Sequence, residues 1–143
     1  MLTSVVTPDL LAASVIAVPP LARNSHSRIS VAENTKIIRA IEAGGVTTLL
    51  YGGNAVFYHM RLTEYADVLS ILSDAAAPNT WIVPSVGPTY GIMMDQAEIL
   101  KDYDFPTVMI LPQKEIADEA GIATGVRHFC RAIWQTDCFV LET

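Results

Sequence analysis

Short apolar runs alternate along this chain with longer stretches that have helical periodicity. Five runs rich in β-branched and aromatic residues predict strands, at residues 14–18, 47–51, 81–86, 107–111 and 138–141. The stretches between them repeat apolar residues every three or four positions, which predicts helices. Strands that alternate with helices in this way are typical of βα units on a parallel sheet.

The ends of the helices are also marked in the sequence. Ser30 and Glu33 have the spacing of a capping box, and the glycine pair at 44–45 is a stop signal, so the first helix is expected between them. Further helices are expected at residues 63–77, 90–101 and 114–135. The side chains expected to face the core are Val31, Ile38, Ile41, Val68, Leu69, Leu72, Met93, Ala97, Leu100, Ile122, Val126, Phe129 and Ile133.

Composition narrows the class of protein. The chain has 143 residues, 51% of them hydrophobic and 17% charged, and a net charge of -6. These values predict one domain, or a piece of one, with a buried sheet. The lack of a basic stripe argues against a nucleic acid partner. No apolar run reaches the roughly 18 residues of a membrane span, and the first eleven residues carry no Lys or Arg. We therefore expect no membrane association and a cytoplasmic location.

Two architectures fit this order of elements. Four and a half βα units are about half of a closed eight-stranded (β/α)₈ barrel of roughly 250 residues. The same elements also fit a complete, open, doubly wound sheet of five strands. The last predicted strand ends within two residues of Thr143, and an open edge rich in Phe and Val invites aggregation. For the barrel, we therefore expect the native chain to continue past Thr143.

A resemblance to a known family favours the barrel. Residues 52–65 read GGNAVFYHMRLTEY, which resembles the segment after strand two in the dihydrodipicolinate synthase and N-acetylneuraminate lyase family, commonly G-[TG]-T-G-E-F-x-x-L-x-x-[DE]-E. In its glycine turn the chain most resembles the 5-dehydro-4-deoxyglucarate dehydratase branch, which has two leading glycines. Residues 17–21, 83–87 and 110–112 resemble the ends of the family's strands one, three and four. The resemblance implies that residues 1–143 are the N-terminal half of a single α/β domain, a parallel (β/α)₈ TIM barrel.

The family's chemistry implies an activity. Its members hold a 2-oxo acid, usually pyruvate or a sugar acid, as a Schiff base on a lysine from strand six, while a tyrosine from strand five relays protons. The iminium withdraws electrons from the bond being broken. The resemblance thus implies a lyase or dehydratase that needs no cofactor or metal and forms a homo-oligomer, a dimer or tetramer. The lysines present, Lys36, Lys101 and Lys114, fall on predicted helices or at a helix start, and we expect them on the surface.

Glu142 is the candidate catalytic residue. It falls where the family's strand-five motif places its proton-relay tyrosine. A glutamate buried beside a substrate can act as an acid or base if desolvation raises its pKa. It can equally be an ordinary carboxylate near a chain end, and both interpretations stay open.

Gly52, Gly53 and Asn54 are the candidate substrate-binding residues. They follow the second predicted strand, at the edge of the sheet where barrel active sites are built. The family uses the amides that match Gly53 and Asn54 to hold the substrate carboxylate, and successive amides can form an anion site. The alternative is a βα turn that needs glycine for its backbone dihedral angles.

Departures from the family pattern leave a second function open. Ala55 and Val56 replace the usual Gly-Glu, and Pro19 stands in place of the strand-one threonine. A relative that has lost the chemistry and serves as a small-acid binding or interaction protein fits these changes. His26 lies in the loop after the first strand, between Arg23 and Arg28. This loop either attracts an acidic substrate or is simply solvated.

Overall fold

The sheet is parallel and its strands follow chain order. The structure, a computed structural model, describes residues 1–112 and 118–134. Within these residues the strands are β1 (Ile16–Ala17), β2 (Thr48–Tyr51), β3 (Trp81–Val86) and β4 (Met109–Ile110). They are ordered β1-β2-β3-β4, and each neighbouring pair is parallel. All four lie within predicted strands, whereas the fifth predicted strand, at 138–141, lies outside the described residues.

This strand order decides between the two predicted architectures. In a doubly wound sheet the order reverses near the first strand, so that strands adjacent in sequence are separated in the sheet. In a (β/α)₈ barrel each strand pairs with the next one along the chain. The order β1-β2-β3-β4 is that of the barrel. The doubly wound alternative is wrong.

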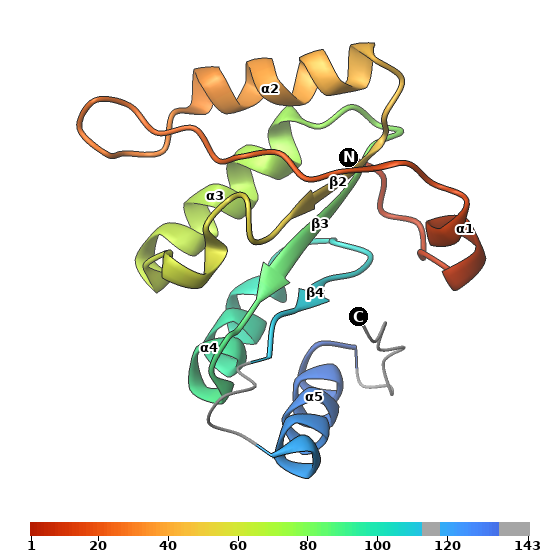
Figure 1. The fold of residues 1–143 in the computed structure, drawn as a ribbon, viewed down its shortest axis with the longest axis vertical. Coiled ribbons are helices and arrows are strands. Elements are labelled where there is room, and N and C mark those ends of the chain that lie inside the picture. The colour runs from red at the N-terminus through yellow and green to blue at the C-terminus, as the bar shows by residue number, and fades with distance from the viewer. Residues whose placement is uncertain (113–117, 135–143) are drawn as a thin grey trace.

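Helices follow the strands as predicted. α2 comprises Val31–Ala43, α3 Leu62–Ala75, α4 Tyr90–Leu100 and α5 Glu119–Trp134, while a 3₁₀ turn, η1 (Phe57–His59), precedes α3 and a short α1 (Pro8–Ala12) precedes β1. α3 and α4 pack on β3, and α5 packs on α4. Figure 1 shows α3 and α4 on one side of the sheet and α1 on the other. None of the described helices is long and apolar enough to cross a membrane.

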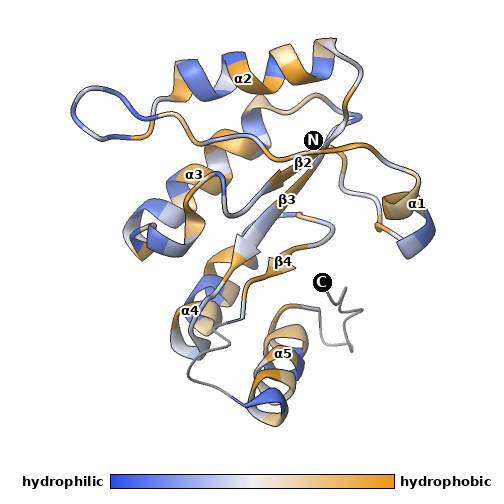
Figure 2. Ribbon diagram, viewed as in Figure 1, coloured by the Kyte–Doolittle hydropathy of each residue, from blue (hydrophilic) through white to orange (hydrophobic). Residues whose placement is uncertain are grey.

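The core lies between the sheet and the helices. Leu49, Tyr51 and Ile82 are fully buried on the helix-facing side of β2 and β3. Most of the predicted core residues are buried against them, and those of α3 and α4 are at most 6% exposed: Val68, Leu69, Leu72, Met93, Ala97 and Leu100. Val31 is an exception, 58% exposed, because it is the first residue of α2 and lies at the end of the helix. Figure 2 shows hydrophobic residues in β2 and β4, a paler β3 and the hydrophilic loop between β1 and α2.

The capping box at the start of α2 is only half formed. The Ser30 hydroxyl accepts a hydrogen bond from the Glu33 amide (3.3 Å), as predicted. The Glu33 carboxylate does not return the bond, because the Ser30 amide donates to the Ala22 carbonyl (3.0 Å) and Glu33 pairs with Lys36 (2.7 Å). The loop before the helix therefore provides the acceptor for the Ser30 amide in place of the Glu33 carboxylate.

Candidate functional site at the carboxyl ends of the strands

The glycine turn lies at the carboxyl end of β2, as predicted. Tyr51 pairs with Pro84 in the register of β2 and β3, so the next residue, Gly52, lies beside Ser85. Ser85 in turn pairs with Met109 on β4. Gly52 is buried, whereas Gly53 and Asn54 are exposed. The turn thus begins inside the sheet and emerges at the edge where barrel enzymes bind their substrates.

Two successive amides of this turn are unpaired. The amide N–H groups of Gly53 and Asn54 have no hydrogen-bond partner among the described residues. The carbonyls of the turn are satisfied, because Phe57 N donates to Gly52 O (3.3 Å) and Val56 N donates to Gly53 O (3.0 Å). Donors without protein acceptors, exposed next to each other, can serve a bound carboxylate.

The side chain of Asn54 ties the turn to the neighbouring strand end. Its Nδ2 donates to the Val18 carbonyl (3.0 Å), just past the end of β1. The contact joins residues 36 positions apart in the chain. It leaves the backbone amide of Asn54 free, so the side chain positions the turn and the backbone remains available to a ligand.

The glycines are not needed for their dihedral angles. Neither Gly52 nor Gly53 has a positive φ, and the left-handed residue of the turn is Val56, with φ 58°. Gly52 leaves room for its neighbours, since a Cβ there would lie 2.5 Å from Met109 Cε and 2.9 Å from Ser85 Oγ, and one of these side chains would have to move. At Gly53 a Cβ would come no closer than 4.0 Å to Tyr58 Cε2. The dihedral explanation offered from the sequence is therefore wrong at both positions.

Three aromatic rings pack against one another next to the turn. Phe57 lies between Tyr51 and Tyr65, with ring centroids 6.4 Å and 6.0 Å away. The Tyr65 hydroxyl donates to the Ser85 carbonyl (3.0 Å), and burial raises the pKa of Tyr65 well above its usual range. Tyr65 therefore stays neutral and acts as a fixed donor that joins α3 to the end of β3.

The loop after β1 is held by an ion pair. Arg23 donates from Nη1 and Nη2 to the two carboxylate oxygens of Glu64, at 2.9 and 3.2 Å, and Nη1 also donates to the Ser27 carbonyl. The hydrogen bond from Arg23 lowers the pKa of Glu64 despite partial burial. Arg23 therefore holds the loop to α3 through these hydrogen bonds. Its neighbours Asn24, His26 and Arg28 line a polar hollow of about 300 Å³.

The described lysines lie away from this edge of the sheet. Lys36 pairs with Glu33 on α2, and Lys101 pairs with Glu98 at the end of α4. Both are exposed, as predicted. Glu142 and Lys114 lie outside the described residues. Among the residues that are described, no group of three His, Cys, Asp or Glu side chains could hold a metal ion.

A second hollow, of about 740 Å³, lies between α4 and α5. Its lining is mainly apolar and includes Met93, Ile110 and Val126. At its rim the Tyr90 hydroxyl lies 3.2 Å from His128 Nδ1. The glycine turn is not part of this hollow, and His128 is exposed.

Comparison with known proteins gives the fold. No family model matches the sequence, and no curated protein matches it. Solved structures do match. Dihydrodipicolinate synthase from Rhodopseudomonas palustris has a TM-score of 0.74 and 20% identity, over 90% of this chain and 42% of that chain. The chain has the fold of the first half of a parallel (β/α)₈ barrel.

Two other matches agree. The 2-keto-3-deoxygluconate aldolase from Picrophilus torridus has a TM-score of 0.73 and 16% identity, over 83% of this chain and 44% of that chain. A prophage protein of the dihydrodipicolinic acid synthase family from E. coli K12, solved with pyruvate, has a TM-score of 0.74 and 12% identity, over 85% and 42%. This chain spans less than half the length of each of these proteins. At such identities the likeness concerns the fold.

Ser85 also lies at this edge of the sheet, but the sequence alone did not identify it as a candidate site residue. It is fully buried, and its hydroxyl has no hydrogen-bond partner within residues 1–112 and 118–134. The available signal was a polar residue in the otherwise apolar run WIVPSV, one residue before the end of the strand. Its significance depends on Gly52, which the sequence places 33 positions away.

Proposed function

We propose that this chain forms the carboxylate-binding half of a Schiff-base-forming lyase or dehydratase that acts on a 2-oxo acid or sugar acid. The observation that carries the proposal is that Gly53 and Asn54, two exposed residues at the carboxyl edge of a barrel sheet, have amides with no partner among the described residues. The named activities of the similar structures, which include an aldolase and a synthase, support the same class of chemistry.

In this mechanism the turn orients the substrate. The amides of Gly53 and Asn54 hold the carboxylate, so that the adjacent 2-oxo carbon faces the inside of the barrel. A lysine amine attacks that carbon and water leaves, which forms the iminium. Lys36 and Lys101 are paired with glutamates on α2 and at the end of α4, so this role requires another lysine. Glu142 is proposed to relay the proton.

A charged side chain introduced at position 53 tests whether the glycine turn binds the substrate carboxylate. Gly53 accepts a side chain, because its φ is not left-handed and a Cβ there finds open space. Gly53→Asp places a negative charge within about 4 Å of the bound carboxylate, which weakens binding at least about fivefold even with the screening of water. Gly53→Asn is the matched neutral control and retains the shape. The measurement is calorimetric titration of the full native chain with pyruvate.

Equal pyruvate affinities for the Asp and Asn variants would refute the proposed site. A wild-type protein that binds neither pyruvate nor 2-keto-3-deoxygluconate would refute the proposed substrate class.

A second measurement addresses the chemistry. Borohydride reduction in the presence of pyruvate adds a covalent adduct to the intact mass if a lysine forms the Schiff base. Exchange of the pyruvate methyl protons in D₂O, followed by NMR, then reports the proton relay. We expect Glu142→Gln to slow exchange while the adduct still forms.

Pyruvate binding without an adduct would favour the alternative function, a small-acid binding protein. The observation in favour of that alternative is the replacement of the family's Gly-Glu by Ala55 and Val56. The 5-dehydro-4-deoxyglucarate dehydratase branch is proposed from the double glycine alone.

A further inference from the structure

Three residues form a row across the inner face of the sheet, one strand apart. Gly52 follows β2, Ser85 lies near the end of β3 and Met109 begins β4. The register pairs Ser85 with Met109 and brings Gly52 beside Ser85. The positions meet in space, since a Cβ on Gly52 would lie 2.9 Å from Ser85 Oγ and 2.5 Å from Met109 Cε.

The Ser85 hydroxyl is buried without a partner. Its exposure is 0%, and its Oγ forms no hydrogen bond with any described residue. Buried hydroxyls in folded proteins are nearly always hydrogen-bonded, so an unpaired one calls for an explanation. The Ser85 carbonyl, by contrast, accepts from Tyr65. The Ser85 carbonyl is thus hydrogen-bonded and holds the backbone in place, whereas the Ser85 hydroxyl has no partner among the described residues.

Other unpaired polar groups lie elsewhere. Among the described residues, the Tyr51 hydroxyl and the Trp81 indole N–H are also buried without partners. Tyr51 contacts Phe57, on the helix-facing side of the sheet. Trp81 is the first residue of β3, at the amino end. Trp81 shares the face of Ser85 but is four residues away from it, so only Ser85 lies on this face beside the glycine turn.

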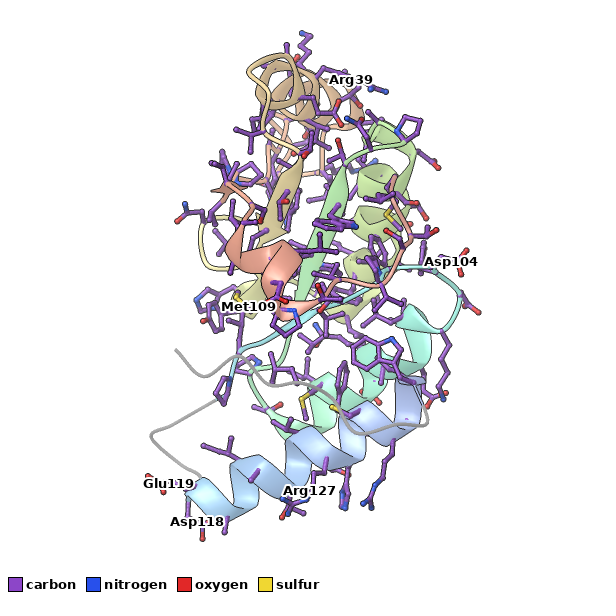
Figure 3. The ribbon with its side chains drawn as sticks, turned by 90° about the vertical axis from the view of Figure 1, so that its right-hand side faces the viewer. Arg39, Asp104, Met109, Asp118, Glu119 and Arg127 are labelled. Carbon is purple, nitrogen blue, oxygen red and sulfur yellow. The ribbon has the colours of Figure 1, made fainter. Side chains whose placement is uncertain are left out.

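The Met109 side chain lies close to this donor, because Met109 Cε and Ser85 Oγ border the same space above Gly52. Its Cε occupies the space above Gly52 that a side chain would otherwise fill. Met109 is only partly buried, and Figure 3 marks it on the ribbon. A methionine side chain has three rotatable bonds and repacks easily. Rotation of Met109 would therefore open the space above Gly52, next to the Ser85 hydroxyl.

We propose that Ser85 is a substrate-binding residue, whose hydroxyl donates a hydrogen bond to the carboxylate of a small 2-oxo acid held at the Gly53 and Asn54 amides. The inference rests on the proposed function of that turn. The ligand displaces the Met109 side chain from Gly52, and one carboxylate oxygen takes the place of the methyl group beside Ser85 Oγ. The absence of a side chain at Gly52 is what lets the ligand approach so closely.

The test compares Ser85→Ala with wild type in the full native chain, with pyruvate as the probe in calorimetric titration. A hydrogen bond to a charged group is strong, so we expect the dissociation constant to rise at least about tenfold. Ser85→Cys, a weaker donor of similar shape, should fall between the two. Met109→Ala serves as a companion variant and should bind at least as tightly as wild type, because the ligand no longer has to displace the side chain.

Folding is measured on the same samples by urea denaturation. Ser85→Ala removes an unpaired hydroxyl, so its midpoint should not fall below that of wild type. Ser85→Ala that binds pyruvate as wild type does would overturn the role of Ser85 and leave the proposed function standing. A wild-type protein that does not bind pyruvate, with the Gly53 variants equally inactive, would overturn both.

Discussion

Glu42 is expected to hold the amino end of β3 in place. It lies near the end of α2, where its Oε1 accepts hydrogen bonds from the Ala77 amide and the Thr80 hydroxyl, both at 2.7 Å. Its Oε2 accepts from Arg39 (3.1 Å). Residues 77–80 form the turn between α3 and β3, and Figure 3 marks Arg39 at the end of the molecule away from Met109. The carboxylate thus joins the end of α2 to the turn between α3 and β3, at the end of the sheet opposite the candidate site.

The expected loss of unfolding free energy depends on which hydrogen-bonding groups a substitution of Glu42 leaves unpaired. Thr80 is fully buried, so its hydroxyl has no access to water once the carboxylate is gone. Hydrogen bonds to a charged group contribute about 1.5 to 3 kcal/mol, and a buried donor left unpaired costs about 1 to 3 kcal/mol. Since the half-buried Ala77 amide can recover a water molecule, we expect Glu42→Ala to lower the free energy of unfolding by about 3 kcal/mol.

Glu33→Ala is the matched control on the same helix. Glu33 pairs with Lys36 as Glu42 pairs with Arg39, three residues apart, but its side chain is 55% exposed and that of Glu42 is 10% exposed. An exposed pair of this kind contributes at most about 0.5 kcal/mol. Urea denaturation at pH 7 measures both variants. Equal losses of stability for the two would refute the reasoning.

The effect of Glu42 should also depend on pH. Burial raises the pKa of its carboxyl, but the hydrogen bonds from Ala77 and Thr80, with Arg39, outweigh burial and lower the pKa below the ordinary 4.5. A carboxyl whose pKa is lowered by folding stabilises the protein above the unfolded-state pKa, and that contribution is lost as the pH falls through the folded-state pKa. The stability gap between wild type and Glu42→Gln should therefore shrink below about pH 4.5. A gap that stays constant from pH 7 to pH 3.5 would contradict the assignment.

Two further predictions concern the support of the glycine turn. Tyr65→Phe leaves the Ser85 carbonyl unpaired and should cost about 1 kcal/mol of unfolding free energy in urea, whereas an unchanged midpoint would show that the bond contributes nothing. Gly52→Ala should cost about 1 to 2 kcal/mol because its Cβ collides with Met109 and Ser85, and adding Met109→Ala should recover part of the loss. Gly53→Ala, with open space around its Cβ, is the control and should stay within about 0.5 kcal/mol of wild type.

Much of the fold could be predicted from the sequence, because its signals are local. Apolar spacing placed the helices over residues 31–43, 62–75 and 90–100 to within one or two residues, and β-branched runs located the strands. The position of the glycine turn followed from the end of the second strand. The half-formed capping box shows the limit of such signals. The partner of the Ser30 amide is Ala22, a choice made by the path of a loop rather than by the spacing of Ser30 and Glu33.

The candidate site was predicted only in part. Gly53 and Asn54 lie after the second strand, as expected, and their amides have no partner among the described residues. Their role in substrate binding stays a prediction, and Glu142 lies outside the described residues. The left-handed conformation at Val56 was not predictable, since a β-branched residue is a poor choice for it. Ser85 was not predicted as a site residue, because the role of a serine in a strand depends on its neighbours on the adjacent strands, which the sequence does not give.

The sequence by itself determined the alternation of strands and helices and the apolar faces, since these depend on residues within a few positions of one another. Tertiary structure decided what depends on residues far apart. Sheet order selected the barrel over the doubly wound alternative, and strand register brought Gly52, Ser85 and Met109 into contact. The packing of α2 against the turn before β3 gave Glu42 its partners. Such contacts are set by the closure of long loops and the mutual fit of the packed elements, for which a single sequence carries no local signal.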